Sequence, residues 1–229
     1  MSSARACATV EDMTPQLMMT KHAHACVTLD KPTSHLLVDP GTFTPNAAQL
    51  VEETGTILVT HEHFDHFDEE MIGAALESRP ELKVYGPDAV VNRWHARPGQ
   101  TVAVAEGDRF SAEGFDVSVF GDLHAPIHRD IPRVANVGFL VDGTLYHPGD
   151  AYVAPPVAIS TLLLPTSGPW TNVGQAADYV RAVSPEQVVQ IHEIMLSEIG
   201  QQSMARFLGP EMLTSVPLTI VPVGDTIFV

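Results

Sequence analysis

The chain has 229 residues, of which 45% are apolar and 17% are charged. This composition is typical of a globular protein with a substantial core and excludes disordered or fibrous classes. Twelve basic and 28 acidic side chains give a formal net charge of −16, which opposes binding to nucleic acid or to an anionic membrane. No apolar run approaches the roughly 18 residues that span a bilayer.

The N-terminal residues 1–14 are expected to form a loose leader to a single domain that covers residues 1–229. Glu11 and Asp12 interrupt any apolar segment of the signal-peptide type, and the two cysteines, Cys7 and Cys26, are too few for a disulfide framework. We therefore expect a cytoplasmic protein.

Short apolar runs bounded by turn residues predict a strand-rich chain. The expected strands are residues 16–19, 25–29, 36–38, 56–59, 82–85, 102–105, 115–120, 134–141, 144–146, 162–164, 188–191, 218–221 and 227–229.

Helices are expected between these strands, beginning at Pro45, Asp68, Pro87, Asn172 and Ser203. Asp68 has the character of an N-cap, and Asn172 with a glutamine three residues later resembles a capping box. Strands with helices in both halves of the chain predict an α/β fold, a four-layer αββα sandwich of two sheets covered by helices.

The run His61-Glu62-His63-Phe64-Asp65-His66 follows the apolar segment 57–59. Imidazole and carboxylate are ligands that zinc, manganese and iron take from proteins. Residues two apart on an extended chain point the same way, so His61 and His63 can share one ion while Asp65 and His66 reach another. The spacing therefore predicts a site for two metals.

Four further ligand-type residues follow the ends of other predicted strands. They are Asp39, His124, Asp150 and His192. Strand ends along one edge of a sheet can converge on a single site. Taken alone, His124 or His192 can equally be structural, and Asp150 can equally form a turn, but together with the 61–66 run they predict one centre.

This ordered set resembles the metallo-β-lactamase superfamily, whose pattern is a strand-end Asp, HxHxDH, a lone His, a lone Asp and a final His. Within it, the chain is similar to compact metal-dependent hydrolases related to L-ascorbate-6-phosphate lactonase. The points of likeness are His24-Ala25, the turn at 38–41 and the loop at 165–170.

The resemblance implies roles for each matching residue. His61, His63 and His124 would hold one metal, Asp65, His66 and His192 the other, and Asp150 would bridge them. Asp39 would support the 61–66 loop, and His24 would line or support the site. Two features depart from related patterns: Ala151 stands where a Thr or Ser often follows the Asp, and His63 stands where the flavodiiron branch has Glu.

A centre of this kind implies hydrolysis of a carbonyl or phosphoryl group by a metal-bound hydroxide. Two divalent ions, two carboxylates and a hydroxide sum to roughly +1, so a small-molecule substrate with anionic character is expected. Besides Asp150, His128 is the candidate catalytic residue because a nearby imidazole can donate to an oxyanion or a leaving group. Trp170 and Tyr152 are candidate pocket walls.

Two other functions fit the same ligands. The first is an iron-dependent redox enzyme of the thiol dioxygenase type, and the second is a metal-binding protein without turnover. A ligand set of imidazoles and carboxylates leaves zinc, manganese and iron open. Since fold does not fix substrate, the target remains undetermined by the sequence.

Overall fold

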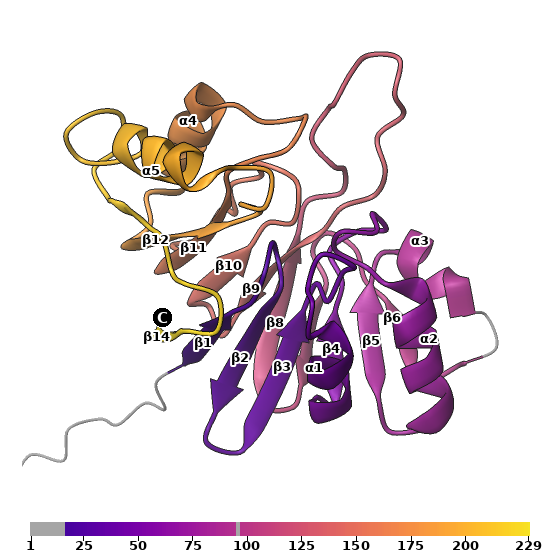
Figure 1. Cartoon of the computed structure of the whole chain (residues 1–229). Helices are drawn as coiled ribbons and strands as arrows, with labels where there is room; N and C mark the ends of the chain where they lie inside the picture. The colour runs from indigo at the N-terminus through magenta and orange to yellow at the C-terminus, as the bar shows by residue number, and fades with distance from the viewer. Residues whose placement is uncertain (1–16, 95–96) are drawn as a thin grey trace, which may run out of the picture.

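The computed structural model describes residues 17–94 and 97–229, so the predicted leader, residues 1–14, lies outside the described residues. Two seven-stranded sheets face each other, with helices α1, α2 and α3 beside one sheet and α4 and α5 over the other (Figure 1). The predicted αββα sandwich is confirmed.

The first sheet has the strand order β14-β1-β2-β3-β4-β5-β6. Its strands β3 to β6 run parallel, whereas β14, β1, β2 and β3 pair antiparallel. The bounds are β1 Met18–Lys21, β2 Val27–Lys31, β3 Ser34–Val38, β4 Thr56–Leu58, β5 Lys83–Gly86, β6 Thr101–Ala103 and β14 Thr226–Phe228.

The second sheet has the order β13-β12-β11-β10-β9-β8-β7, with β10 to β13 parallel and β7 to β10 antiparallel. The bounds are β7 Arg109–Ala112, β8 Phe115–Phe120, β9 Gly138–Val141, β10 Leu145–His147, β11 Thr161–Pro165, β12 Gln187–Ile191 and β13 Leu218–Thr219. Each sheet thus has a parallel half whose strands end at a common edge.

Helices α1 to α4 begin near their predicted starts. Asp68 accepts a hydrogen bond from the amide of Met71, and Asn172 accepts one from the amide of Gln175 at 3.0 Å. The bounds are α1 Ala47–Glu53, α2 Glu69–Ser78, α3 Asp88–Val91 with a 3₁₀ turn at Asn92–Trp94, α4 Val173–Val183 and α5 Glu198–Phe207.

Alternating strand residues build three apolar cores. In β3, Leu36 and Val38 enter the core between the sheets, whereas Leu37 packs under α1 and α2. In β11, Leu163 enters the same central core, whereas its neighbours face α4. Because successive strand side chains point to opposite faces, strands covered on both faces are apolar throughout. This is the physical basis of the four layers.

Three expectations differ from the structure. Strand β7 was not predicted, because its sequence Arg-Phe-Ser-Ala is polar and mostly exposed at the sheet edge. Strand β9 begins at Gly138 and not at residue 134, because Asn136 instead makes an isolated bridge to His61. Helix α5 begins after Ser197, five residues early, because none of its residues is buried to produce an apolar stripe.

Within the described ranges, no helix combines the length and the apolar character that crossing a membrane requires.

Candidate metal centre

Strand ends bring the predicted ligands to one place. His61 follows β4, His124 follows β8, Asp150 follows β10 and His192 follows β12 directly. The parallel strands of each sheet end at the same edge, and at this edge the two sheets meet. All four side chains are buried, each with 3% or less of its surface exposed.

His61, His63, His124 and Asp150 form the first ligand cluster, with one donor atom of each within 4.8 Å of the others. His61 Nε2 and His63 Nδ1 lie 3.2 Å apart and point at the same space. The Nδ1 atom of His124 donates to the carbonyl of Ala125 at 2.6 Å, which leaves its Nε2 lone pair free. These are the residues predicted for the first metal, with Asp150 beside them.

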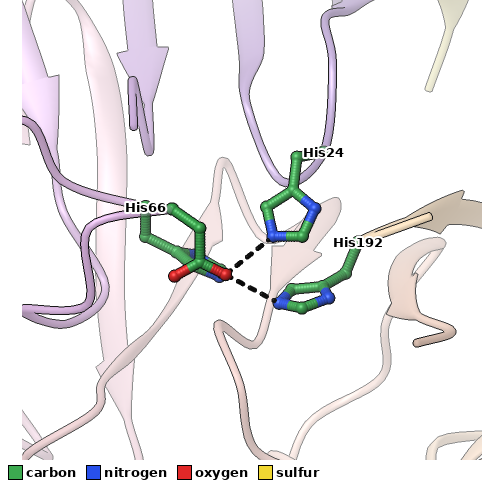
Figure 2. A group of neighbouring side chains, drawn as sticks. His24, His66 and His192 are labelled. Carbon is green, nitrogen blue, oxygen red and sulfur yellow. Dashed lines mark hydrogen bonds and ion pairs between the residues drawn. The ribbon is translucent and has the colours of Figure 1, made fainter. Parts of the chain in front are cut away.

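His24, Asp65, His66 and His192 form the second ligand cluster. Asp65 Oδ2 lies 2.9 Å from His24 Nε2 and 3.5 Å from His192 Nε2. Figure 2 shows the imidazoles of His24, His66 and His192 gathered at this cluster. His24 is thus as close to this cluster as the three residues assigned to it from the sequence. The sequence indicated only that His24 lines or supports the site.

Asp150 lies between the two ligand clusters. Its Oδ1 is 3.2 Å from His66 Nε2, and its Oδ2 is 3.1 Å from His192 Nε2 and 3.4 Å from His124 Nε2. Its amide donates to Asn136 Oδ1 at 2.9 Å. One carboxylate therefore faces nitrogen ligands of both clusters.

Asp39 holds the 61–66 loop in place, as the family resemblance implied. It accepts hydrogen bonds from the Thr60 amide at 2.8 Å, from the Thr60 hydroxyl at 2.7 Å and from His66 Nδ1 at 2.7 Å. The Thr60 hydroxyl oxygen also lies 3.0 Å from His61 Nδ1. With Nδ1 of both imidazoles occupied by acceptors, their Nε2 atoms are the ones available to a metal.

Three residues of the centre adopt left-handed backbone conformations. The φ angles of His24, Asp39 and His192 are 63°, 49° and 57°. Non-glycine residues in this region carry strain of about 1–3 kcal/mol and persist only where the surrounding structure enforces it. Three such residues at one centre mark it as a functional site.

The ionisation of the cluster follows from burial and mutual attraction. Burial opposes ionisation of Asp150, but the imidazoles of His66 and His192 outweigh it and hold the pKa of its carboxyl well below its usual range. Burial lowers the pKa of His61 well below its usual value and that of His24 to about 4. These two imidazoles are therefore neutral at pH 7, the form in which histidine binds a metal.

Several buried polar atoms lack hydrogen-bond partners among the described residues. They include His66 Nε2, Asp150 Oδ1 and His192 Nε2, all of which face the space between the clusters. A buried polar atom without a partner costs about 1–3 kcal/mol. Divalent ions bound by imidazole and carboxylate would satisfy these atoms, so the residues present fit a metal centre.

A buried ion pair supports the second ligand cluster, and the sequence did not predict it. Lys21 Nζ lies 3.0 Å from Glu193 Oε1 and 3.0 Å from the carbonyl oxygen of His24. Glu193 also accepts from the amide of His24 at 3.1 Å, and the amide of His192 donates to the carbonyl of His24 at 3.0 Å. Burial lowers the pKa of Lys21, while Glu193 opposes that shift.

Of the two predicted walls, only Trp170 lines the pocket over the clusters. The pocket has a volume of about 210 Å³. The indole Nε1 of Trp170 donates to Asp150 Oδ2 at 2.9 Å. Tyr152 lies behind Trp170, with ring centroids 5.1 Å apart, and donates its hydroxyl to the carbonyl of Pro165. Tyr152 thus supports the wall from outside the pocket.

His128 is not brought to the clusters. It lies on the connection between β8 and β9, which projects beyond the sheets (Figure 1), and 57% of its side chain is exposed. Its Nδ1 accepts a hydrogen bond from the amide of Asp130. His128 is absent from the described lining of the pocket, so its catalytic role stays a prediction that this geometry does not favour.

The 61–66 loop packs against the turn after β3 at Gly41. A β-carbon at Gly41 would lie 2.0 Å from the carbonyl oxygen of Asp65 and 2.5 Å from the amide nitrogen of His66. We expect Gly41→Ala to lower the free energy of unfolding by about 3 kcal/mol, since overpacking against backbone cannot relax by side-chain rotation. Urea denaturation measures this.

Gly174→Ala is the matched control, because Gly174 is exposed in the first turn of α4. Alanine there should be neutral or stabilise by up to about 1 kcal/mol. Equal stability of the two variants would contradict close packing at Gly41.

Lys21→Met tests the buried ion pair. Removing the cation leaves the Glu193 carboxylate, only 14% exposed, without its partner, and loss of one member of a buried pair costs about 3–5 kcal/mol. We expect thermal and urea unfolding to show a loss in this range. Lys83→Met, at an exposed position in β5, should change stability by less than about 0.5 kcal/mol, and a similar small effect at Lys21 would refute the structural role.

Comparison with known proteins identifies the family. A family model described as "Beta-lactamase superfamily domain" matches residues 18–192. The chain is 32% identical over 186 residues to protein Rv0786c of Mycobacterium tuberculosis, covering 79% of this chain and 86% of that protein. It is 28% identical over 196 residues to a UPF0173 metal-dependent hydrolase of Myxococcus xanthus, covering 76% and 69%.

Solved structures share the fold. The metallo-β-lactamase fold protein YhfI from Bacillus subtilis matches with a TM-score of 0.71 at 15% identity, covering 94% of this chain and 100% of that one. The finer resemblance to L-ascorbate-6-phosphate lactonase stays a prediction. Because the family model matches residues 18–192, the chain belongs to the β-lactamase superfamily. Together with the similarity to relatives named as metal-dependent hydrolases, this identifies it as a metal-dependent hydrolase.

Proposed function

We propose that the protein hydrolyses a small-molecule ester, lactone or phosphorylated compound at a centre of two divalent ions, with zinc or manganese favoured over iron. The observation that carries this proposal is the position of Asp150. Its two oxygens face His66 and His192 of the second ligand cluster and His124 of the first. A carboxylate so placed supports a role as the bridge between two ions.

The two ligand clusters would each hold one ion. His61, His63 and His124 would hold one ion. Asp65, His66 and His192 would hold the other, and His24, whose Nε2 is 2.9 Å from Asp65 Oδ2, would either join them or orient Asp65. The absence of any thiolate from these two clusters of described residues supports zinc, manganese or iron over softer ions.

Divalent ions held by these residues would lower the pKa of water to about 7 and would so supply a hydroxide nucleophile at neutral pH. The protein's part is to fix the ligands and to exclude bulk water from the substrate. Asp39 and Thr60 hold the imidazoles of His66 and His61 in place. Trp170 donates to Asp150 Oδ2, which restrains the carboxylate.

Trp170 also compensates for a departure from the family pattern. The residue after Asp150 is Ala151, which has no hydroxyl to offer. The indole N–H of Trp170 supplies a hydrogen bond to the same carboxylate from another loop. We infer that this donor replaces the missing hydroxyl.

Metal content and hydrolysis together test the proposal. Protein purified without added metal should contain about two equivalents of a divalent ion by elemental analysis, and a chelator should abolish turnover. Asp150→Asn should reduce the metal content and lower kcat/KM by at least about 100-fold. Even substitution of a residue that only hydrogen-bonds to a metal ligand lowers metal affinity or activity by about 10- to 100-fold.

Asp178→Asn is the matched control, since Asp178 is exposed on α4 with 80% of its side chain accessible. Its metal content and turnover should match those of the unmodified protein. A single equivalent of iron with oxygen uptake would instead favour the redox alternative. Full metal loading without Asp150-dependent hydrolysis of esters, lactones or phosphoesters would favour a binding protein.

Trp170→Phe tests the compensating hydrogen bond. Phenylalanine keeps an aromatic wall but removes the N–H donor, so we expect kcat/KM to fall by about tenfold while most of the metal is retained. Trp94→Phe, on the distant 3₁₀ turn beside Phe67, is the control. If the two variants have the same turnover, the indole does not position Asp150.

A further inference from the structure

The walls of the pocket over the ligand clusters are apolar. Apart from five residues of those clusters, the described lining consists of Phe43, Phe64, Ile127, Pro169, Trp170 and Met195. The single side-chain N–H group on these described walls belongs to the Trp170 indole, which already donates to Asp150. A substrate in this pocket therefore meets polar atoms at the reacting centre and apolar surface elsewhere.

Away from the ligand clusters, the described lining of the pocket offers no cationic partner for a charged group on the substrate. Among its described lining residues there is no lysine or arginine, the side chains that recognise phosphate and carboxylate. Arg133 lines a neighbouring hollow that shares His63, His124 and Ile127 with the pocket. Its guanidinium donates to the carbonyls of His124 and Leu123, and Arg133 is not among the described residues that line the pocket itself. A phosphate held away from the ions would be buried without compensation, which is costly.

Acidic residues next to the pocket also disfavour an anion. Glu62, Asp68, Glu69 and Glu70 line a neighbouring hollow that shares Phe64 with the pocket. The one cation in that described lining, Arg93, is paired with Glu62 and Glu69. Surplus negative charge in this neighbouring hollow disfavours the approach of anionic ligands.

The apolar walls continue outward to exposed side chains at the mouth. Phe64 is 63% exposed on the 61–66 loop, and Met195 is 56% exposed three residues after His192. Phe43 packs edge-on against Phe64, with ring centroids 5.4 Å apart. Large apolar side chains that remain exposed beside a pocket mark a surface that is covered when a ligand binds.

We propose that the substrate is a neutral carboxylic ester or lactone with an apolar acyl group, which lies along Phe64, Met195 and Trp170 while its carbonyl meets the metal centre. This inference rests on the proposed hydrolytic function and narrows it. In the reaction, a water oxygen forms a bond to the acyl carbon and the acyl C–O bond breaks. Its electron pair leaves with the alcohol oxygen, which takes a proton, so no oxidant or reductant is needed.

The metal-loaded protein tests this with p-nitrophenyl acetate, p-nitrophenyl hexanoate, p-nitrophenyl phosphate and bis(p-nitrophenyl) phosphate. Each rate is corrected by subtracting the rate of Asp150→Asn. A buried methylene is worth up to about fourfold, so four of them should raise kcat/KM on the order of 100-fold from acetate to hexanoate. The hexanoate should also exceed both phosphates.

Two variants test whether Phe64 and Met195 contact the acyl group of the substrate. Phe64→Ser and Met195→Ser should each lower the hexanoate-to-acetate ratio of kcat/KM by about fivefold or more, with unchanged metal content. Phe228→Ser, which alters a residue 58% exposed on β14, is the matched control and should leave the ratio unchanged. γ-Butyrolactone and α-hexyl-γ-butyrolactone, which carries its added chain next to the carbonyl, provide the same comparison for lactones.

The outcomes separate this inference from the function on which it rests. Asp150-dependent hydrolysis that favours either phosphate, or that shows no gain with acyl length, would overturn the apolar-substrate inference and leave the hydrolase proposal standing. If kcat/KM rises from acetate to hexanoate by the same factor in Phe64→Ser and Met195→Ser as in the unmodified protein, these two residues do not form the surface that contacts the acyl group. No Asp150-dependent turnover of any probe would count against both proposals.

Discussion

The structure depends on a buried group of carboxylates and imidazoles at the edge where the two sheets meet. Asp39 and Asp150 are almost fully buried, and each faces the imidazole of His66 from a different side. Isolated carboxylates at such depth would be prohibitively costly. They are tolerated because imidazoles from both sheets compensate them, and divalent ions would satisfy the nitrogen and oxygen atoms that remain without partners.

The backbone is adapted to this centre at several points. Asp39 and His192 each turn the chain with a positive φ directly after a strand, and His24 does so in the connection between β1 and β2. At Gly149, with a φ of 62°, a β-carbon would lie 2.3 Å from Asn136 Oδ1, so glycine lets the turn before Asp150 pack against Asn136. The Lys21–Glu193 pair then connects the loop of His24 to the loop of His192. Tight backbone packing thus fixes where the ligands lie, which a metal centre requires.

Different parts of the chain supply the ligand clusters and the walls that would contact the substrate. The ligand clusters come from the strand ends of both sheets, whereas the pocket walls come from connecting loops. The connection between β8 and β9, which projects beyond the sheets in Figure 1, supplies Ile127, and the 61–66 loop supplies Phe64. Loops can change without disturbing the scaffold, so one ligand arrangement can serve different substrates. The apolar walls are the basis on which we propose a neutral, apolar substrate.

The sequence by itself determined the fold class and the identity of the ligand-type residues. Apolar runs bounded by turns predicted most strands, and the residues after them, from His61 to His192, carry the ligand-type side chains. Periodicity did not reveal β7 or the start of α5, because an exposed polar strand and a helix without buried residues leave no apolar pattern. Only the tertiary structure decided that His24 lies among the residues of the second ligand cluster, that Trp170 donates to Asp150, and that Lys21 pairs with a residue 172 positions away. These contacts join distant segments, and their geometry depends on how the two sheets pack, which no local pattern in the sequence encodes.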